Sequence, residues 1–173
     1  MTDDRHAIID TTLCSIALAA SGENLVGLAF ELNGHYSAGA TIGPVVDSAH
    51  DPLLRAAHTQ LTEYLTGDRR DFDLPLATHG DAFSEQVWAL LREIPYGETT
   101  TYGAIATALG NPRFAQRIGQ VVGRNPIGII IPCHRVIGAD GTLTGFGGGL
   151  DRKRRLLDLE EPAERLSLIH ISE

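Results

Sequence analysis

Residues 125–136 read Asn-Pro-Ile-Gly-Ile-Ile-Ile-Pro-Cys-His-Arg-Val, an apolar run that leads into residues capable of chemistry. The apolar residues 127–131 predict a buried strand, because a short apolar run bounded by turn residues is typical of one. Such a strand would end at Cys133 and His134. Cys133 is the candidate nucleophile, since a thiolate is a strong, soft nucleophile and His134 could serve as its base.

The segment upstream predicts two helices joined by a tight turn. Residues 102–109 form the first helix, residues 110–112 the turn and residues 112–123 the second helix. This is the helix-turn-helix pattern, although an ordinary helical hairpin in a core reads the same way. Gly119 and Gly123 each cost the second helix roughly 1 kcal/mol relative to alanine. Small residues there suit a helix that approaches another surface closely.

The charge of the chain is unevenly distributed. The formal net charge of the 173 residues is -8, which is unusual for a DNA-binding protein. Residues 101–157, however, contain eight basic residues against two acidic ones, a local balance of +6. Arg113, Arg117 and Arg124 surround the second helix of the motif. Phosphate contacts depend on the local field, so a basic face remains compatible with an acidic chain.

The first part of the chain predicts a small α/β domain over residues 1–75. Two strands are expected at 12–20 and 24–32, with a hairpin turn between them, and a third near 40–46. Asp51 followed by proline is a sound helix start, because aspartate caps and proline suits the first turn. No residue in this domain suggests a chemical role.

The second domain is predicted over residues 82–160. It begins with a helix at 82–93 and closes with a helix at 150–160, while Asp140-Gly141 predicts a hairpin turn after the cysteine segment. Residues 161–173 are expected to form a tail. The expected fold class is α+β.

The segment Pro132-Cys133-His134-Arg135-Val136, with Asn125-Pro126 before it, closely resembles the active-site signature of the O6-alkylguanine-DNA alkyltransferases. Further matches are Ile94-Pro-Tyr-Gly-Glu98, Tyr102-Gly103, Gly110-Asn-Pro112, Gly145-Phe-Gly-Gly-Gly149 and Arg152-Lys153. The resemblance extends from residue 83 to residue 160. It implies an N-terminal α/β domain joined to a helical domain with a helix-turn-helix.

The resemblance also implies a reaction. Cys133 would take the alkyl group from O6-alkylguanine, and from O4-alkylthymine, in duplex DNA, irreversibly and once per molecule. His134 would be the base, directly or through a water, and Glu160 would orient it. Asn125 would shape the turn before the active site. Tyr102 would help rotate the nucleotide out of the duplex and protonate the departing guanine.

In this family the second helix of the motif lies in the minor groove, where Gly119 would allow close approach. The family usually has an arginine that fills the gap left by the flipped base, but Gln116 stands there, with Arg117 next. Either Gln116 fills the gap or Arg117 reaches in; the favoured assignment gives Gln116 the gap and Arg117 a phosphate or packing role. The expected DNA-binding residues are Arg113, Gln116, Arg117, Gly119, Arg124 and Arg135.

The expected substrate pocket is formed by Val136, Phe146 and Gly147. Phe146 occupies a position where many members have tyrosine, so it could wall the pocket by packing but lacks the hydroxyl. The three glycines at 147–149 hint at a roomy pocket.

Three rival functions remain open on sequence grounds. An alkyltransferase-like protein binds lesions without transfer, but such proteins lack the cysteine that this chain has at position 133. A DNA-binding regulator would read sequence through the same helices, and no second DNA-binding module is visible. A thiol hydrolase normally brings its cysteine and histidine together from distant positions, and would leave the helix-turn-helix without a purpose.

No cofactor and no metal are expected. The histidines are scattered without paired ligand spacing, and Cys14 reads as a small buried hydrophobe in a strand. No apolar run approaches the roughly 20 residues that span a bilayer, and no secretory signal is visible. The expected protein is a cytoplasmic monomer whose partner is double-stranded DNA containing alkylated guanine, and membranes are not expected as partners.

Overall fold

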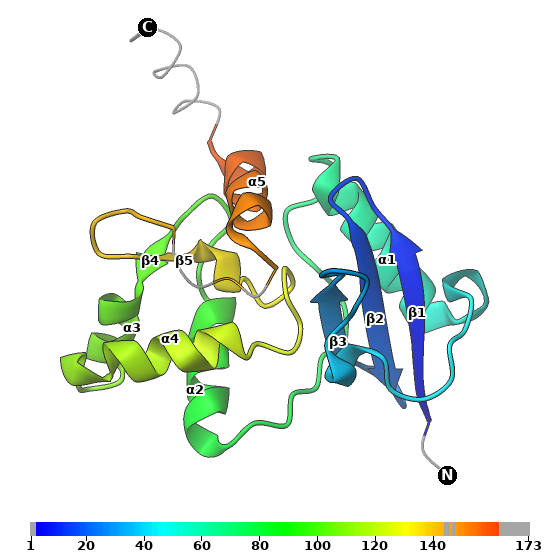
Figure 1. The fold of residues 1–173 in the computed structure, drawn as a ribbon, viewed down its shortest axis with the longest axis horizontal. Coiled ribbons are helices and arrows are strands. Elements are labelled where there is room, and N and C mark those ends of the chain that lie inside the picture. Colours follow the sequence, from blue (N-terminus) through cyan, green and yellow to red (C-terminus); the bar gives the residue numbers. More distant parts are fainter. Residues whose placement is uncertain (1–2, 144–145, 147, 163–173) are drawn as a thin grey trace, which may run out of the picture.

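The computed structural model describes residues 3–143, 146 and 148–162. Figure 1 shows two halves side by side: a three-stranded sheet with helix α1 against it, and a group of helices α2 to α4. Helix α5 lies at the junction between them (Figure 1). This arrangement confirms the predicted α+β class. No helix in the described part of the chain is long and apolar enough to cross a membrane.

The sheet of the N-terminal half is antiparallel, in the order β1-β2-β3. Its strands are β1 (Asp4–Asp10), β2 (Ser15–Ser21) and β3 (Asn24–Phe30). The hairpin turn between β2 and β3 is confirmed, and Gly22 supplies the positive φ of 59° that it needs. Strand β1 was not predicted, because its polar start hides the alternation. Residues 16–20 of β2 are fully buried, so this strand forms the centre of the core.

The predicted strand near 40–46 is wrong. Two short 3₁₀-helices, η1 (Ala38–Ala40) and η2 (Ser48–His50), flank a segment that pairs with β1 as an isolated bridge between His6 and Val45 rather than as a ladder. Pro44 has no N–H to donate and Gly43 has a φ of +64°, so a regular ladder cannot continue through this segment.

Helix α1 (Pro52–Leu65) packs against the sheet and begins where it was predicted to begin. The Asp51 side chain accepts a hydrogen bond from the Leu54 amide at 3.0 Å, which caps the first turn. The buried residues Leu54, Ala57, Leu61 and Tyr64 lie on one stripe of the helix. This stripe points Tyr64 toward the junction between the two halves.

The helix-turn-helix is present in the C-terminal half. Helix α2 (Ala82–Arg92) precedes it, and the motif consists of α3 (Tyr102–Ala108) and α4 (Ala115–Gly123). The second helix starts with a 3₁₀ turn, η3 (Pro112–Phe114), so α4 is shorter than predicted. Trp88 of α2 is buried, and its Nε1 donates to the Val121 carbonyl at 3.1 Å. This bond holds α2 against α4.

The strand predicted at 127–131 is also wrong, for a physical reason. Both ends of the segment are tied to one side chain: Asn125 accepts from the Ile127 amide at 3.0 Å and donates to the Ile131 carbonyl at 2.7 Å. Ile129 has a φ of +68°, which a β-branched residue rarely adopts. The apolar run is therefore a buried turn. Periodicity alone cannot separate these two cases, because both place isoleucines in the core.

A two-stranded parallel sheet joins the helix-turn-helix to the cysteine segment. Strand β4 (Thr100–Thr101) pairs with β5 (Val136–Ile137) immediately before Tyr102 begins α3. The turn at Asp140-Gly141 is present, since the Gly138 amide donates to the Thr142 carbonyl at 2.9 Å. Residues 142–143 are not a strand, so the predicted hairpin is wrong.

Helix α5 (Leu150–Glu160) is the last helix of the described residues and has the predicted bounds. Two arginines of its basic run, Arg152 and Arg155, bind the N-terminal half. Arg152 donates to the Glu31 carbonyl, and the Nη2 of Arg155 donates to the Thr12 carbonyl at 2.9 Å. These bonds fix the position of α5 relative to the sheet.

Candidate active site

Cys133 is the first residue of η4 (Cys133–Arg135) and is 8% exposed. It lines a cavity of about 450 Å³ between the two halves of the chain. The cavity wall is formed by residues of β3 and the loop after it, of the end of α4, and of the glycine-rich segment; they include Leu28, Phe30, Tyr36, Val122, Gly123, Asn125, Gly128, Phe146 and Gly148. The nucleophile is therefore buried but reachable through one cavity.

The Cys133 thiol is protonated in this environment. Burial raises the pKa of Cys133 above its ordinary value, while the hydrogen bond with Asn125 and the positive charge of Lys153 act in the opposite direction. Because burial dominates, the cysteine needs a base that removes its proton during the reaction. Asn125 also holds the turn described above, so its predicted place in the site agrees with its contacts.

His134 is placed to be that base. Its Nε2 lies 2.8 Å from Oε2 of Glu160, and since a carboxylate only accepts, Nε2 carries the proton. Its Nδ1 is fully buried and has no hydrogen-bond partner among the residues that the structure describes. Burial lowers the pKa of His134 below 6.5, although Glu160 opposes this, so the ring is neutral near pH 7. The free lone pair is therefore on Nδ1, in the form that can accept a proton.

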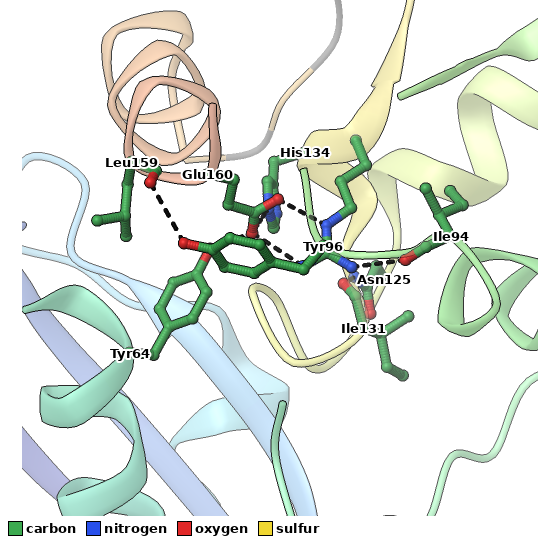
Figure 2. Close-up of polar contacts among 9 residues, drawn as sticks. Tyr64, Ile94, Tyr96, Asn125, Ile131, His134, Leu159 and Glu160 are labelled. Carbon is green, nitrogen blue, oxygen red and sulfur yellow. Dashed lines mark hydrogen bonds and ion pairs between the residues drawn. The ribbon is translucent and has the colours of Figure 1, made fainter. Parts of the chain in front are cut away.

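Glu160 lies at the end of α5 and is 2% exposed. Burial by itself would raise its pKa, but hydrogen bonds from His134, Arg135 and Tyr64 outweigh that effect and hold the pKa at about 2. The carboxylate is thus charged at any ordinary pH. Figure 2 shows Glu160 between His134 and Tyr64.

Arg135 was expected to contact DNA, and the structure contradicts this. Its Nε and Nη2 donate to the two oxygens of Glu160 at 2.7 and 2.9 Å, and its Nη1 donates to the Ile94 carbonyl at 2.6 Å. The residue is 8% exposed. Its charge is used inside the protein, where it neutralises the buried carboxylate.

Lys153 is a site residue that the sequence analysis missed. It is fully buried, its Nζ donates to the Val136 carbonyl at 2.6 Å, and burial lowers its pKa while Cys133 acts to raise it. Lysine is almost never fully buried without a partner. A signal was present in the sequence, since Lys153, Leu156 and Glu160 share one face at helical spacing.

Two tyrosines that were given no role from the sequence also reach the site. Tyr64 of α1 donates its hydroxyl to Oε2 of Glu160, and Tyr96 donates to the Leu159 carbonyl at 3.2 Å (Figure 2). Tyr96 belongs to the turn after α2, where Gly97 has a φ of +84° and packs against the Glu160 carbonyl. No local pattern marks Tyr64, because its partner is 96 positions away.

Tyr102 lies at the start of α3, half-buried and outside the lining of the cavity. Its ring is beside Gly119, where an added Cβ would lie 3.8 Å from two ring carbons. At Gly123 an added Cβ would meet nothing within 4 Å. The two glycines therefore differ: Gly119 gives room to the tyrosine, and Gly123 leaves open space beside the cavity.

The predicted DNA-contacting side chains on and around α4 are mostly exposed; these are Arg113, Gln116, Arg117 and Arg124. Arg117 is an exception in its contacts, because its guanidinium lies 3.9 Å from the centroid of the Phe83 ring. Such stacking favours a packing role for Arg117. Gln116 has no comparable contact to hold it on the protein surface.

The predicted pocket residues are only partly brought together. Phe146 lines the cavity, and its ring centroid lies 5.5 Å from that of Phe30 on β3. Val136 is fully buried in β5, outside the cavity lining. Gly147 lies outside the described residues. Within the described ranges no group of three or more histidine, cysteine or acidic residues could hold a metal ion.

The fold and the site together define a class: a helix-turn-helix protein with a buried cysteine backed by a histidine and a glutamate. Residues 82–162 match the model of the 6-O-methylguanine DNA methyltransferase DNA binding domain, and residues 5–78 match that of the 6-O-methylguanine DNA methyltransferase ribonuclease-like domain. The chain belongs to the 6-O-methylguanine DNA methyltransferase family.

Named relatives agree with this assignment. Methylated-DNA--protein-cysteine methyltransferases of Methanosarcina acetivorans and Mycobacterium bovis are 44% identical over 157 residues, which is 90% of this chain and 97% and 92% of theirs. The crystal structure of Mycobacterium tuberculosis O6-methylguanine methyltransferase matches with a TM-score of 0.81 and 41% identity, over 96% of this chain and 99% of that one. A Mycobacterium tuberculosis structure in complex with DNA matches at 0.79 and 40%, over 93% and 97%.

Proposed function

We propose that this protein is a methylated-DNA–protein-cysteine methyltransferase that moves the alkyl group of O6-alkylguanine in duplex DNA onto its own Cys133. The observation that carries the proposal is the placement of Cys133 at the wall of a cavity, with a neutral histidine and a charged glutamate behind it. Family membership supports the reaction, and the DNA-bound relative supports duplex DNA as the partner.

The transfer is written with its atoms balanced. The thiol proton of Cys133 passes to Nδ1 of His134, directly or through a water, while Sγ bonds to the alkyl carbon. The bond from that carbon to O6 breaks, and its electron pair leaves with guanine. Guanine takes a proton from the Tyr102 hydroxyl, which is restored from the imidazolium through solvent. The thioether has no route back to a thiol, so each molecule reacts once, without a cofactor.

The target base has to leave the duplex to reach Cys133, because an atom inside stacked base pairs is inaccessible to a buried thiol. Gln116 at the start of α4 is proposed to fill the gap, with Arg113 and Arg124 on phosphates and Gly123 giving room for the backbone. The cavity wall on the N-terminal side, formed by Leu28 and Phe30, is apolar and suits an alkyl group. O4-alkylthymine is a second expected substrate.

The proposed division of labour places the reaction in residues 82–160 and a supporting domain in residues 1–75. A monomer is the proposed active form. DNA is the proposed partner through phosphate contacts that are independent of sequence, as a protein that scans the genome requires.

Mass spectrometry tests the proposal directly. Incubation with a duplex that contains one O6-methylguanine should add the mass of one methyl group, on Cys133 and in a stoichiometric amount. Cys133→Ala should abolish the mass increase and leave DNA binding largely intact. Cys14→Ala is the matched control, in which both the mass increase and DNA binding should be as in wild type. Binding without any mass gain would identify a lesion-binding protein instead, and repeated turnover on an acyl substrate would identify a hydrolase.

A further inference from the structure

Tyr64 lies in the N-terminal half, yet its hydroxyl reaches the end of α5 in the C-terminal half. It donates to Oε2 of Glu160, and the side chain is fully buried. Its ring packs against Phe72 at 5.3 Å and edge-on against Tyr96 at 6.2 Å, measured between centroids. Packing against these two rings therefore helps to set the direction of the hydroxyl. Figure 2 shows Tyr64 beside Tyr96 and Glu160.

The oxygen that Tyr64 contacts is the one that binds the histidine. Oε2 of Glu160 accepts from Tyr64, from Nε2 of His134 at 2.8 Å and from Nη2 of Arg135 at 2.9 Å, while Oε1 accepts from Nε of Arg135 at 2.7 Å. Donors on one carboxylate oxygen share its negative charge. The hydrogen bond from Tyr64 therefore reduces the charge that Glu160 presents to the imidazole.

We propose that Tyr64 is a positioning residue for the alkyl transfer: its hydroxyl holds the Glu160 carboxylate against His134 and limits how strongly that carboxylate favours a proton on the ring. The inference rests on the proposed function for its meaning in catalysis. Its geometric content, which is control of the histidine through Glu160, can be measured without any reaction. It gives the N-terminal half a part in the chemistry.

The charged and titratable groups around this pair all bear on the proposal. Arg135 from η4 and Lys153 from α5 are cations, and both act with burial to lower the pKa of His134. Tyr64 from α1 keeps its own proton, because burial and the nearby carboxylate raise its pKa far above the ordinary value. It therefore remains a donor at every pH at which the protein is folded.

The sign of the effect follows from these contacts. Without the hydroxyl, Glu160 keeps more of its charge for His134, so the pKa of His134 rises. The ring then stays protonated to a higher pH, and a protonated ring cannot accept the thiol proton. Tyr64→Phe should therefore move the acid limb of the transfer rate to higher pH.

Tyr64→Phe and Tyr96→Phe make a matched pair for the test. Each variant removes one phenol hydroxyl that donates a hydrogen bond near the end of α5. The Tyr64 hydroxyl donates to the Glu160 carboxylate, whereas the Tyr96 hydroxyl donates to the Leu159 carbonyl. The first readout is the titration of the His134 ring by nitrogen-15 NMR of the full chain without DNA, assigned with a His134→Asn variant. The second is the pH profile of single-turnover methyl transfer.

Tyr64→Phe should raise the His134 midpoint by roughly half to one pH unit, the effect of losing one of several hydrogen bonds to a charged group. Tyr96→Phe should leave it in place. Equal titrations in wild type and Tyr64→Phe would overturn the proposal and leave the hydroxyl with a structural role only. If Tyr64→Phe shifts the His134 midpoint but the wild-type protein never transfers a methyl group, Tyr64 controls His134 through Glu160 as inferred, and the proposed function is overturned.

A second measurement covers a Tyr64→Phe variant that fails to fold. Tyrosine is replaced by 3-fluorotyrosine in the Tyr96→Phe background. The fluorine makes the Tyr64 hydroxyl a stronger donor and keeps Glu160 as its hydrogen-bond partner. The His134 midpoint should then move down, opposite to the effect of removing the hydroxyl. An unchanged midpoint would also overturn the proposal.

Discussion

Two regions near Cys133 differ in where their charged side chains lie: one region is buried and the other is exposed. Behind it lies the relay cluster, which we define as His134, Arg135, Lys153, Glu160 and Tyr64; each is at most 8% exposed. In front lies the α4 face, defined as Arg113, Gln116, Arg117 and Arg124, all exposed. Residues in the relay cluster are buried and hydrogen-bonded inside the protein, whereas those of the α4 face are exposed to another molecule.

A local count of basic residues therefore does not measure a DNA-binding surface. Of the eight basic residues in 101–157, Arg135 and Lys153 are buried, and Arg152 and Arg155 bind carbonyls of the N-terminal half. The positive charge left for phosphates comes mainly from the α4 face. Arg152 and Arg155 hold α5 against the N-terminal half. Arg135 binds Glu160, and Lys153 favours the thiolate form of Cys133.

The largest expected effect comes from breaking the relay cluster at Glu160. Glu160→Gln leaves the buried Arg135 charge without its partner, and such a loss costs about 3–5 kcal/mol of the free energy of unfolding. Urea denaturation measures it. The control is Glu63→Gln, which removes an exposed partner of Arg69 at 3.0 Å and should cost at most about 1 kcal/mol. Similar losses in both variants would contradict the distinction between buried and exposed charge.

The same variant has a signature in its pH dependence. The pKa of Glu160 is about 2 in the folded protein and ordinarily 4.5, so its contribution to stability is complete above pH 4.5 and is lost as the pH falls toward 2. The gap in stability between wild type and Glu160→Gln should narrow over that range. A gap that stays constant down to pH 3 would contradict a lowered pKa of Glu160 in the folded protein.

Lys153→Met tests the cation whose charge acts on Cys133. Loss of its charge removes one of the influences that lower the pKa of Cys133, so the thiol becomes harder to ionise. The rate of methyl transfer should fall about tenfold, which corresponds to about one pKa unit. Iodoacetamide labelling of Cys133 against pH gives the thiol midpoint. Arg154→Met, an exposed neighbour on α5, should leave both the rate and the midpoint unchanged.

The sequence named candidate site residues from motif positions but did not predict their surroundings. Of these candidates, His134 is bonded to Glu160 and Asn125 is hydrogen-bonded to Cys133. Arg135 was misplaced on the DNA surface, because a motif gives a residue type without the direction of its side chain. The burial of a charge depends on which distant groups arrive around it.

The errors in the fold have the same origin. The isoleucines of 127–131 are buried as predicted, but Asn125 ties both ends of the segment and makes it a turn. Tyr64 gave no local signal because its role exists only once α1 and α5 are packed together. Patterns report which residues are buried, and long-range contacts decide what the buried groups do.

On the α4 face, Gln116→Ala tests the gap-filling side chain. The loss should appear only in duplex DNA, where unstacking a base costs a few kcal/mol, and should slow methyl transfer roughly fivefold. Reaction with free O6-benzylguanine should be unchanged, because no duplex has to be held open. Gln120→Ala, one turn further along the same helix and also exposed, is the control. Equal losses on both substrates would exclude Gln116 as the residue that fills the gap.

The smallest effect separates the two regions most cleanly, because it depends on salt rather than on chemistry. Arg113→Gln and Arg124→Gln should each reduce the slope of log affinity for undamaged duplex against log salt by about one, since each removes one phosphate contact. Arg117→Gln should change the slope less, because its guanidinium is stacked on Phe83. Fluorescence anisotropy at several salt concentrations gives these slopes. Unchanged slopes for Arg113 and Arg124 would place the phosphate contacts outside the α4 face.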